Sequence, residues 1–251
     1  RFTKGGTIPK GWDFKRKFFS KAGNAVSKII LGIKGVNDFT TGYKASRVKG
    51  YADSIDLDNI LSKGFAYKID LLYKMHKAGA KIKEVPIHFG LRDEGESKME
   101  GNNLKDSLRV VITLRLRDPD TKKFLRFCVV GFIGFFVDTG LFNLLRVYTE
   151  NPKTSSLISG FIAMITTFTL NNFWSFKKNK IEGTRKKITG FIIYIISSYI
   201  PIFLRSQMIK FAVSRFGNTF WVANITFLIG VILGLIWNYC VYSKIIWKDK
   251  K

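Results

Sequence analysis

Residues 92–98, Arg-Asp-Glu-Gly-Glu-Ser-Lys, bring together side chains that can hold a phosphate group. Arg92 can form two parallel hydrogen bonds with phosphate oxygens, Ser97 can donate from its hydroxyl, and Lys98 adds an ammonium charge. Gly95 lets the backbone turn tightly. A solvated turn has the same composition, so a phosphate-binding loop and an ordinary surface loop are both interpretations of this segment taken alone.

Other residue types that could carry chemistry are isolated in the sequence. Neither His76 nor His88 has a second His, a Cys or a pair of carboxylates at a metal-ligand spacing, so we interpret both as non-ligands. Asp56 and Asp58 have the Asp-x-Asp spacing. We interpret these two as solvated residues at the start of a helix.

Two amphipathic segments are expected to form helices that lie on a membrane surface. In residues 14–33, apolar positions recur every three or four residues, and Lys and Arg occupy much of the remainder. A packed surface helix would show the same pattern, but basic residues beside Phe14 and Phe18 favour an interfacial position. Residues 104–116 repeat the pattern. An anionic lipid headgroup would then lie close to residues 92–98.

The segment between these helices suggests α/β layering. The sequence predicts a helix at Gly64–Lys77, which ends at Gly79. Lys81–Phe89 alternates around Pro86 and reads as a strand. A helix followed by such a strand is typical of an α/β domain.

Charge and composition exclude several classes of protein. The chain has 251 residues, 42 of them Lys or Arg against 18 Asp or Glu, for a net charge of +24, yet 46% of it is apolar. A disordered basic tail is excluded by the apolar content. Four long runs with almost no charge after residue 124 exclude a wholly soluble protein. Nucleic-acid binding is disfavoured, because membrane topology accounts for the positive charge.

The four apolar runs predict four membrane-spanning helices. About 20 apolar residues cross a hydrocarbon core of roughly 30 Å, and the third run reaches that length if its helix continues past Arg205. Basic residues gather before the first run, between the second and third, and in the C-terminal tail. Both ends of this integral membrane protein are therefore expected on the cytoplasmic side, together with the soluble domain. The runs are Phe127–Leu145, Ser156–Phe176, Ile188–Leu204 and Phe220–Ser243.

Polar residues inside these runs have two interpretations. They can form hydrogen bonds between helices, or they can line a site for a lipid headgroup, and packing is the favoured reading. Gly230 and Gly234 have the spacing of a close helix contact. The polar residues concerned are Asp138, Asn143, Asn171, Asn172 and Asn238.

Several segments resemble, in order and spacing, polyprenyl-phosphate glycosyltransferases, which are family 2 enzymes with a GT-A fold. The most similar type is the membrane-anchored dolichol-phosphate mannose synthase. Later segments resemble the GtrA-like four-helix domain that is fused to many such enzymes. The first group is Arg1-Phe-x-Lys-Gly-Gly6, Trp12 with Arg16-Lys17, Asp38-Phe-Thr-Thr-Gly-Tyr-Lys-Ala45, Glu84-Val-Pro-Ile-x-Phe89 and Arg92-x-x-Gly-x-Ser-Lys98. The second group is Phe124-Leu-Arg-Phe127, Val130-Gly131, Val137-Asp138 and Leu170-Asn-Asn-Phe-Trp-Ser-Phe-Lys177.

This resemblance implies a fold in three parts. Residues 1–103 would be the C-terminal, acceptor part of a GT-A α/β domain, including the interfacial helix at 14–33. Residues 104–123 would be an interfacial helix and linker, and 124–251 an all-α, four-helix transmembrane bundle. The family's metal-binding Asp-x-Asp precedes the segment that matches residues 1–6, whereas Asp56-Leu-Asp58 follows it. We therefore expect the donor-binding half to lie upstream, and residues 1–251 alone to be inactive.

The implied activity is transfer of a hexose, with inversion, to a polyprenyl or dolichyl phosphate at the cytoplasmic membrane face. The implied donor is a nucleotide sugar, most simply GDP-mannose, with a divalent metal (Mg or Mn) held by the upstream half. The resemblance assigns Arg1, Arg16 and Arg92 to catalysis and acceptor-phosphate binding, with Ser97 and Lys98 in the adjoining loop. Two alternatives are a UDP-glucose-dependent glucosyltransferase and a non-catalytic GtrA-like flippase subunit. Arg16 could also be a plain surface residue of a basic helix.

Overall fold

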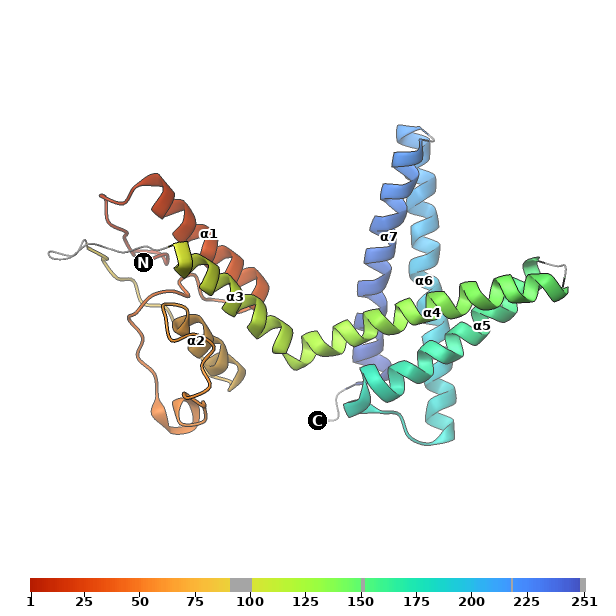
Figure 1. Cartoon of the computed structure of the whole chain (residues 1–251), viewed down its shortest axis with the longest axis horizontal. Helices are drawn as coiled ribbons and strands as arrows, with labels where there is room; N and C mark the ends of the chain where they lie inside the picture. Colours follow the sequence, from red (N-terminus) through yellow and green to blue (C-terminus); the bar gives the residue numbers. More distant parts are fainter. Residues whose placement is uncertain (91–100, 150–151, 218, 249–251) are drawn as a thin grey trace. The chain divides into compact units, whose positions relative to one another are not determined.

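The computed structural model describes residues 1–90, 101–149, 152–217 and 219–248. The chain forms two compact units, Arg1–Asp118 and Pro119–Lys251, and each is described by itself. The first unit contains α1 (Phe14–Leu31), α2 (Tyr67–Lys77) and α3 (Gly101–Arg117), with a short irregular turn at Val48–Ala52 (Figure 1).

Helix α1 confirms the helix expected at residues 14–33. It begins where the Asp13 carboxylate accepts a hydrogen bond from the backbone N–H of Arg16 at 2.8 Å. It ends at Gly32, whose φ of 69° is a left-handed conformation that favours glycine. The buried face of α1 carries Asn24, Ser27 and Leu31.

The opposite face of α1 is apolar and exposed. Phe14 is 82% exposed and Ile29 is 79% exposed, and Phe18 and Phe19 are also exposed. Phe14 and Phe18 stack with ring centroids 6.3 Å apart. Helix α3, which was expected at 104–116, likewise exposes part of its apolar surface, at Leu108, Ile112 and Leu116.

The first unit has its own hydrophobic core. Residues of α2, α3 and the segment after α1 make up this cluster, and α3 packs against both α1 and α2. Just after α3, Asp118 accepts a hydrogen bond from the Tyr73 hydroxyl and forms an ion pair with Lys77 of α2. The fully buried core side chains include Ile33, Val36, Phe39, Ile69, Val110 and Val111.

The prediction of a strand at Lys81–Phe89 is wrong. The residues that the structure describes form no β-strand. This segment meets residue Thr7 in a single parallel bridge, with Thr7 N–H donating to the Ile87 carbonyl at 3.0 Å and Phe89 N–H to the Thr7 carbonyl at 3.2 Å. A strand requires a partner of several residues, and only this one bridge pairs the segment here. The α/β layering inferred from it, and with it the GT-A part of the fold, stays a prediction.

The second unit contains four long helices. They are paired as two antiparallel hairpins, α4 with α5 and α6 with α7 (Figure 1). Shorter turns follow α5 and α7: π-helical turns at Asn171–Ser175 and Tyr242–Ile246, and a 3₁₀ turn at Lys177–Asn179. The helices are α4 (Pro119–Thr149), α5 (Pro152–Leu170), α6 (Thr184–Phe216) and α7 (Phe220–Val241).

Among the residues that the structure describes, three helical segments are long and apolar enough to cross a membrane: Pro119–Leu145, Thr184–Phe216 and Phe220–Ile246. The expected continuation of the third run past Arg205 is confirmed, because α6 extends to Phe216. The expected second run corresponds to α5, which is not one of the three. A membrane domain is therefore supported, while the fourth span and the orientation stay predictions.

Small residues bring the helices of each hairpin close together. A Cβ added at Gly230 of α7 would lie 2.5 Å from Cγ of Arg205, and one at Gly234 would lie 3.0 Å from Cβ of Pro201. Both partners belong to α6, so the close contact predicted from the Gly230–Gly234 spacing is confirmed. Thr167 of α5 similarly occupies the space that a side chain at Gly134 of α4 would need.

Three of the polar residues in the predicted spans form hydrogen bonds within the fold. Asp138 of α4 accepts a bond of 2.6 Å from the Ser159 hydroxyl of α5. Asn172 accepts bonds from the indole N–H of Trp247 at 2.9 Å and the backbone N–H of Ile181 at 2.7 Å. Asn143 donates to a carbonyl of its own helix. The packing interpretation is thus supported for Asp138 and Asn172, whereas the bond of Asn143 stays within α4 and does not support it.

An aromatic cluster surrounds the Asn172 contact. Trp247 is fully buried and stacks on Phe176 with centroids 4.7 Å apart and planes 4° from parallel. Tyr194 of α6 and Tyr242 stack at 4.5 Å in the same cluster. The Asn-Asn-Phe-Trp-Ser-Phe segment after α5 therefore packs against Trp247, which follows α7, and against Ile181, which precedes α6.

Candidate functional site

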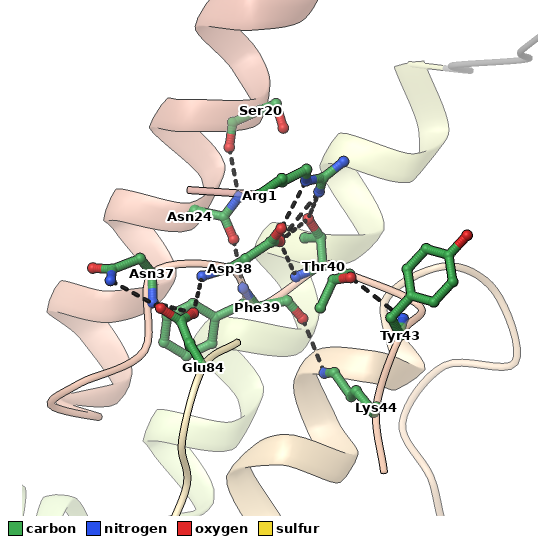
Figure 2. Close-up of polar contacts among 11 residues, drawn as sticks. Arg1, Ser20, Asn24, Asn37, Asp38, Phe39, Thr40, Tyr43, Lys44 and Glu84 are labelled. Carbon is green, nitrogen blue, oxygen red and sulfur yellow. Dashed lines mark hydrogen bonds and ion pairs between the residues drawn. The ribbon is translucent and has the colours of Figure 1, made fainter. Parts of the chain in front are cut away.

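Arg1 lies at the centre of the candidate site, in the first unit (Figure 2). Its Nε donates to Asp38 Oδ2 at 2.7 Å, and its Nη2 donates to Asp38 Oδ1 at 3.1 Å and to Thr40 Oγ1 at 2.8 Å. The Arg1 side chain is 9% exposed and that of Asp38 is 4% exposed. Arg1 and Asp38 therefore form a buried, bidentate ion pair, and Nε and Nη2 of Arg1 both donate hydrogen bonds within the protein.

The loop that carries Asp38 is held by two other side chains. Glu84 Oε1 accepts from the backbone N–H groups of Asn37 at 2.7 Å and Asp38 at 2.8 Å, and its Oε2 accepts from the Asn37 side chain at 2.9 Å. Asn24 of α1 accepts from the Phe39 backbone N–H at 2.7 Å (Figure 2). The position of Asp38, and through it of Arg1, is thus fixed by both α1 and the extended segment at 81–89.

Trp12 brings Arg1 and Arg16 to one place. The Arg16 guanidinium lies 4.4 Å from the centroid of the Trp12 ring and that of Arg1 lies 5.6 Å from it. Phe89 packs edge-on against Trp12 at 6.0 Å and also contacts Arg1. Trp12 is only 7% exposed, so these cation–π contacts are largely shielded from water.

Two lysines add positive charge beside Asp38. Lys44 donates to the carbonyls of Phe39 at 3.3 Å and Lys68 at 2.8 Å. Desolvation of its amine lowers the pKa of Lys44 to about 8, although Asp38 opposes that change and Lys68 reinforces it. Desolvation, followed by repulsion from Arg1, also lowers the pKa of Lys68. Three cationic side chains therefore gather around Asp38, whose backbone N–H is bonded by the second carboxylate, Glu84, and the remaining excess of positive charge suits an anionic ligand.

The structure brings together two of the five residues predicted to hold the acceptor phosphate. Arg1 and Arg16 meet at Trp12, as described. Arg92, Ser97 and Lys98 lie outside the described residues, in the segment that begins shortly after Phe89. The role assigned to each of these five residues stays a prediction.

The positioning role of Asp38 and Glu84 was not identified from the sequence. Both residues belong to segments that carry the family resemblance, but no chemistry was assigned to either. The sequence held no signal for this role, because the burial of Arg1, which requires a carboxylate partner, is seen only in the structure.

No group of three or more His, Cys, Asp or Glu side chains at metal-binding distances is found among the residues described. Asp56 is exposed, and its carboxylate accepts from the backbone N–H groups of Asp58 and Asn59 and from the Asn59 side chain. These bonds, led by the one from the Asn59 side chain, lower the pKa of Asp56. Asp56 is thus solvated as expected, but it caps a turn rather than a helix. The divalent metal stays a prediction.

Comparison with known proteins shows what the chain is similar to. Residues 126–247 match the family model described as GtrA/DPMS, transmembrane domain. A dolichol-phosphate mannosyltransferase of Pyrococcus furiosus is 28% identical over 249 residues, which cover 98% of this chain and 66% of that relative. The chain is dolichol-phosphate-mannosyltransferase-like, with a GtrA-like membrane domain.

Two bacterial relatives give the same indication over shorter stretches. A polyprenol monophosphomannose synthase of Mycolicibacterium smegmatis is 38% identical over 108 residues, or 43% of this chain and 40% of the relative. An undecaprenyl-phosphate mannosyltransferase of Micrococcus luteus is 42% identical over 90 residues, or 36% of each chain. The chain thus spans less than two thirds of the length of each of these relatives. The GtrA-like domain begins at residue 126, inside α4.

Proposed function

We propose that this chain is the acceptor-binding and membrane part of a polyprenyl-phosphate mannosyltransferase. The support is the named activity of three relatives, together with two arginines gathered at a buried tryptophan. The reaction is attack of a lipid phosphate oxygen on the anomeric carbon of a nucleotide sugar. The bond from that carbon to the nucleoside diphosphate breaks, and the configuration inverts.

The site's contribution follows from the charges of the reactants. The lipid phosphate must approach a diphosphate that is also negative, and guanidinium groups offset this repulsion. A phosphate monoester has its second pKa at about 6, so the attacking oxygen is already ionised near neutral pH and needs no general base.

The geometry limits what Arg1 can contribute to this task. Arg1 is neutralised by Asp38, and its hydrogen bonds to Asp38 and Thr40 occupy Nε and Nη2. The Arg16 guanidinium lies over the Trp12 ring, 4.4 Å from its centroid. We therefore assign to Arg1 a role that is partly structural, and we keep Arg16 and Arg92 as proposed ligands of the phosphate.

The exposed face of α1 supports a position on the bilayer. Its apolar side chains, Phe14, Phe18 and Ile29, face outward from the protein. The helix carries five basic residues and no acidic one. An apolar stripe bordered by positive charge binds an anionic membrane surface, and would bring Arg16 to the level of lipid phosphates.

We further propose GDP-mannose as the donor, a divalent metal bound upstream, and the cytoplasmic face as the location. The first is supported by the mannosyl activity named for the relatives. The last is supported by the basic residues at 177–187 and at the tail. With the full-length protein, mannose transfer from GDP-mannose to a polyprenyl phosphate is expected. Transfer of glucose from UDP-glucose instead would replace this proposal by the glucosyltransferase alternative.

Acceptor recognition can be tested on the chain itself without a donor. Farnesyl phosphate should bind the purified protein, and farnesol, which lacks the phosphate, should bind at least about tenfold more weakly. Arg16→Gln should weaken farnesyl phosphate binding about tenfold, the ratio set by roughly 1.4 kcal/mol. Lys15→Gln, which removes the same charge from the adjacent exposed residue, is the matched control. Equal binding of alcohol and phosphate, or equal effects of the two variants, would refute this assignment.

A further inference from the structure

Arg205 places a positive charge within the long apolar helix α6. The helix runs from Thr184 to Phe216, and the stretch from Ile188 to Leu204 carries no charged residue. None of the carboxylates among the described residues forms an ion pair with Arg205. An ionised side chain at such a position is costly unless it reaches the interface or meets an opposite charge.

The Arg205 side chain is held in one place by α7. A Cβ at Gly230 would lie 2.5 Å from Cγ of Arg205 and 2.9 Å from its Cβ, so only glycine leaves room for this stem. The guanidinium lies over the Phe227 ring, 4.7 Å from its centroid. The arginine is therefore seated in a notch on α7, with less rotamer freedom than a lysine or arginine on an open helix surface.

The depth of the notch determines which groups it can meet. Arg205 is 21 residues beyond Thr184, or about 32 Å along the helix at 1.5 Å per residue. The hydrocarbon core of a bilayer is roughly 30 Å thick. If the basic cluster before α6 lies at one membrane surface, the guanidinium lies at the other, at the level of lipid phosphates.

We propose that Arg205, seated at Gly230 and Phe227, is a binding site for the phosphate group of a membrane lipid in the leaflet remote from residues 177–187. A fixed guanidinium binds phosphate through paired, charge-assisted hydrogen bonds. Glycerophospholipids and phosphorylated polyprenyl lipids share this chemistry. The site is in the GtrA-like domain, so it does not depend on the transferase activity proposed above.

The test measures lipid binding to the purified full chain in neutral detergent by native mass spectrometry. The probes are phosphatidylglycerol and undecaprenyl phosphate, with diacylglycerol as the neutral reference. Arg205→Gln should reduce binding of at least one phosphate lipid about tenfold, and Arg205→Lys about threefold because an ammonium lacks the planar fork. A loss for both probes identifies a general phosphate site, and a loss for undecaprenyl phosphate alone identifies a polyprenyl site.

Two matched controls separate the notch from its surroundings. Lys210→Gln removes an exposed charge from the same end of α6, and it should leave binding unchanged. Gly230→Ala keeps the charge but displaces the stem, whereas Gly234→Ala disturbs the same helix pair at Pro201; only the first should lose binding. Equal losses for Arg205→Gln and Lys210→Gln, or binding of diacylglycerol as tight as that of the phosphate lipids, would overturn the proposal. If Gly230→Ala does not fold, the comparison of Arg205 with Lys210 still decides.

Discussion

Replacing Asp38 by Asn should loosen the candidate site while leaving the membrane domain intact. The substitution keeps the shape of the side chain but removes the charge that faces Arg1, whose fork it holds at 2.7 and 3.1 Å. Breaking a buried pair by removing one partner costs about 3–5 kcal/mol, because the other charge is left uncompensated. Phe2, Trp12 and Phe89 surround the Arg1 guanidinium at 5.1 to 5.6 Å and still stabilise it. We therefore expect the lower end, about 3 kcal/mol.

Hydrogen exchange measures this loss locally. The backbone N–H groups of residues 37–39 are bonded to Glu84 and Asn24, and their protection depends on the loop that Asp38 anchors. A loss of about 3 kcal/mol corresponds to roughly hundredfold faster exchange. Peptides from residues 184–200 serve as the internal reference, and Asp56→Asn is the control for an exposed carboxylate. Exchange at 37–39 that is unchanged, or no faster than in Asp56→Asn, would refute the reasoning.

Three further outcomes are expected. Trp12→Leu should weaken farnesyl phosphate binding about threefold to tenfold, and Trp12→Phe should restore most of it, because the ring face is what orients the arginines; equal affinities of the two variants would count against this. The Lys44 pKa is about 8 when folded and 10.5 in the reference state, so the unfolded chain binds the extra proton between these values. Unfolding free energy should therefore rise from pH 8 to 10, and Lys44→Met should flatten that rise; an unchanged slope would contradict the assignment. Single cysteines at positions 153 and 180 should be labelled from opposite membrane sides, whereas labelling from one side would show that α5 does not cross.

The helices could be predicted from the sequence because their signals are local. Asp13 and Gly32 mark the ends of α1, and the apolar repeat between them gives its faces. The long apolar runs identify α4, α6 and α7 in the same way, by length and composition. The strand prediction at 81–89 was wrong because alternating apolar and polar side chains describe one segment only, and a strand also needs a second segment to pair with. Its partner cannot be read from the segment itself.

The candidate site could be predicted in its residue types but not in its contacts. Arg1 and Asp38 are 37 positions apart, and Asp38 and Glu84 are 46 apart. No periodicity links positions at such separations, so their pairing depends on how the chain folds back. The family resemblance named the arginines. It did not show that one of them is engaged by a buried carboxylate, which changes the share of ligand charge that it can carry.

Hydrogen bonds within the protein also limit what the polar residues of the membrane domain can bind. Asp138 and Asn172 could have lined a headgroup site, but Asp138 accepts from Ser159 on the neighbouring helix and Asn172 from Trp247 and Ile181. Bonds of this kind between segments stabilise packing, and a residue so engaged has less capacity for a ligand. Arg205 differs in kind, since its stem is fixed against Gly230 and its contact is a ring face. A ring face lowers the cost of the charge without neutralising it, so the demand for an anion at that position persists.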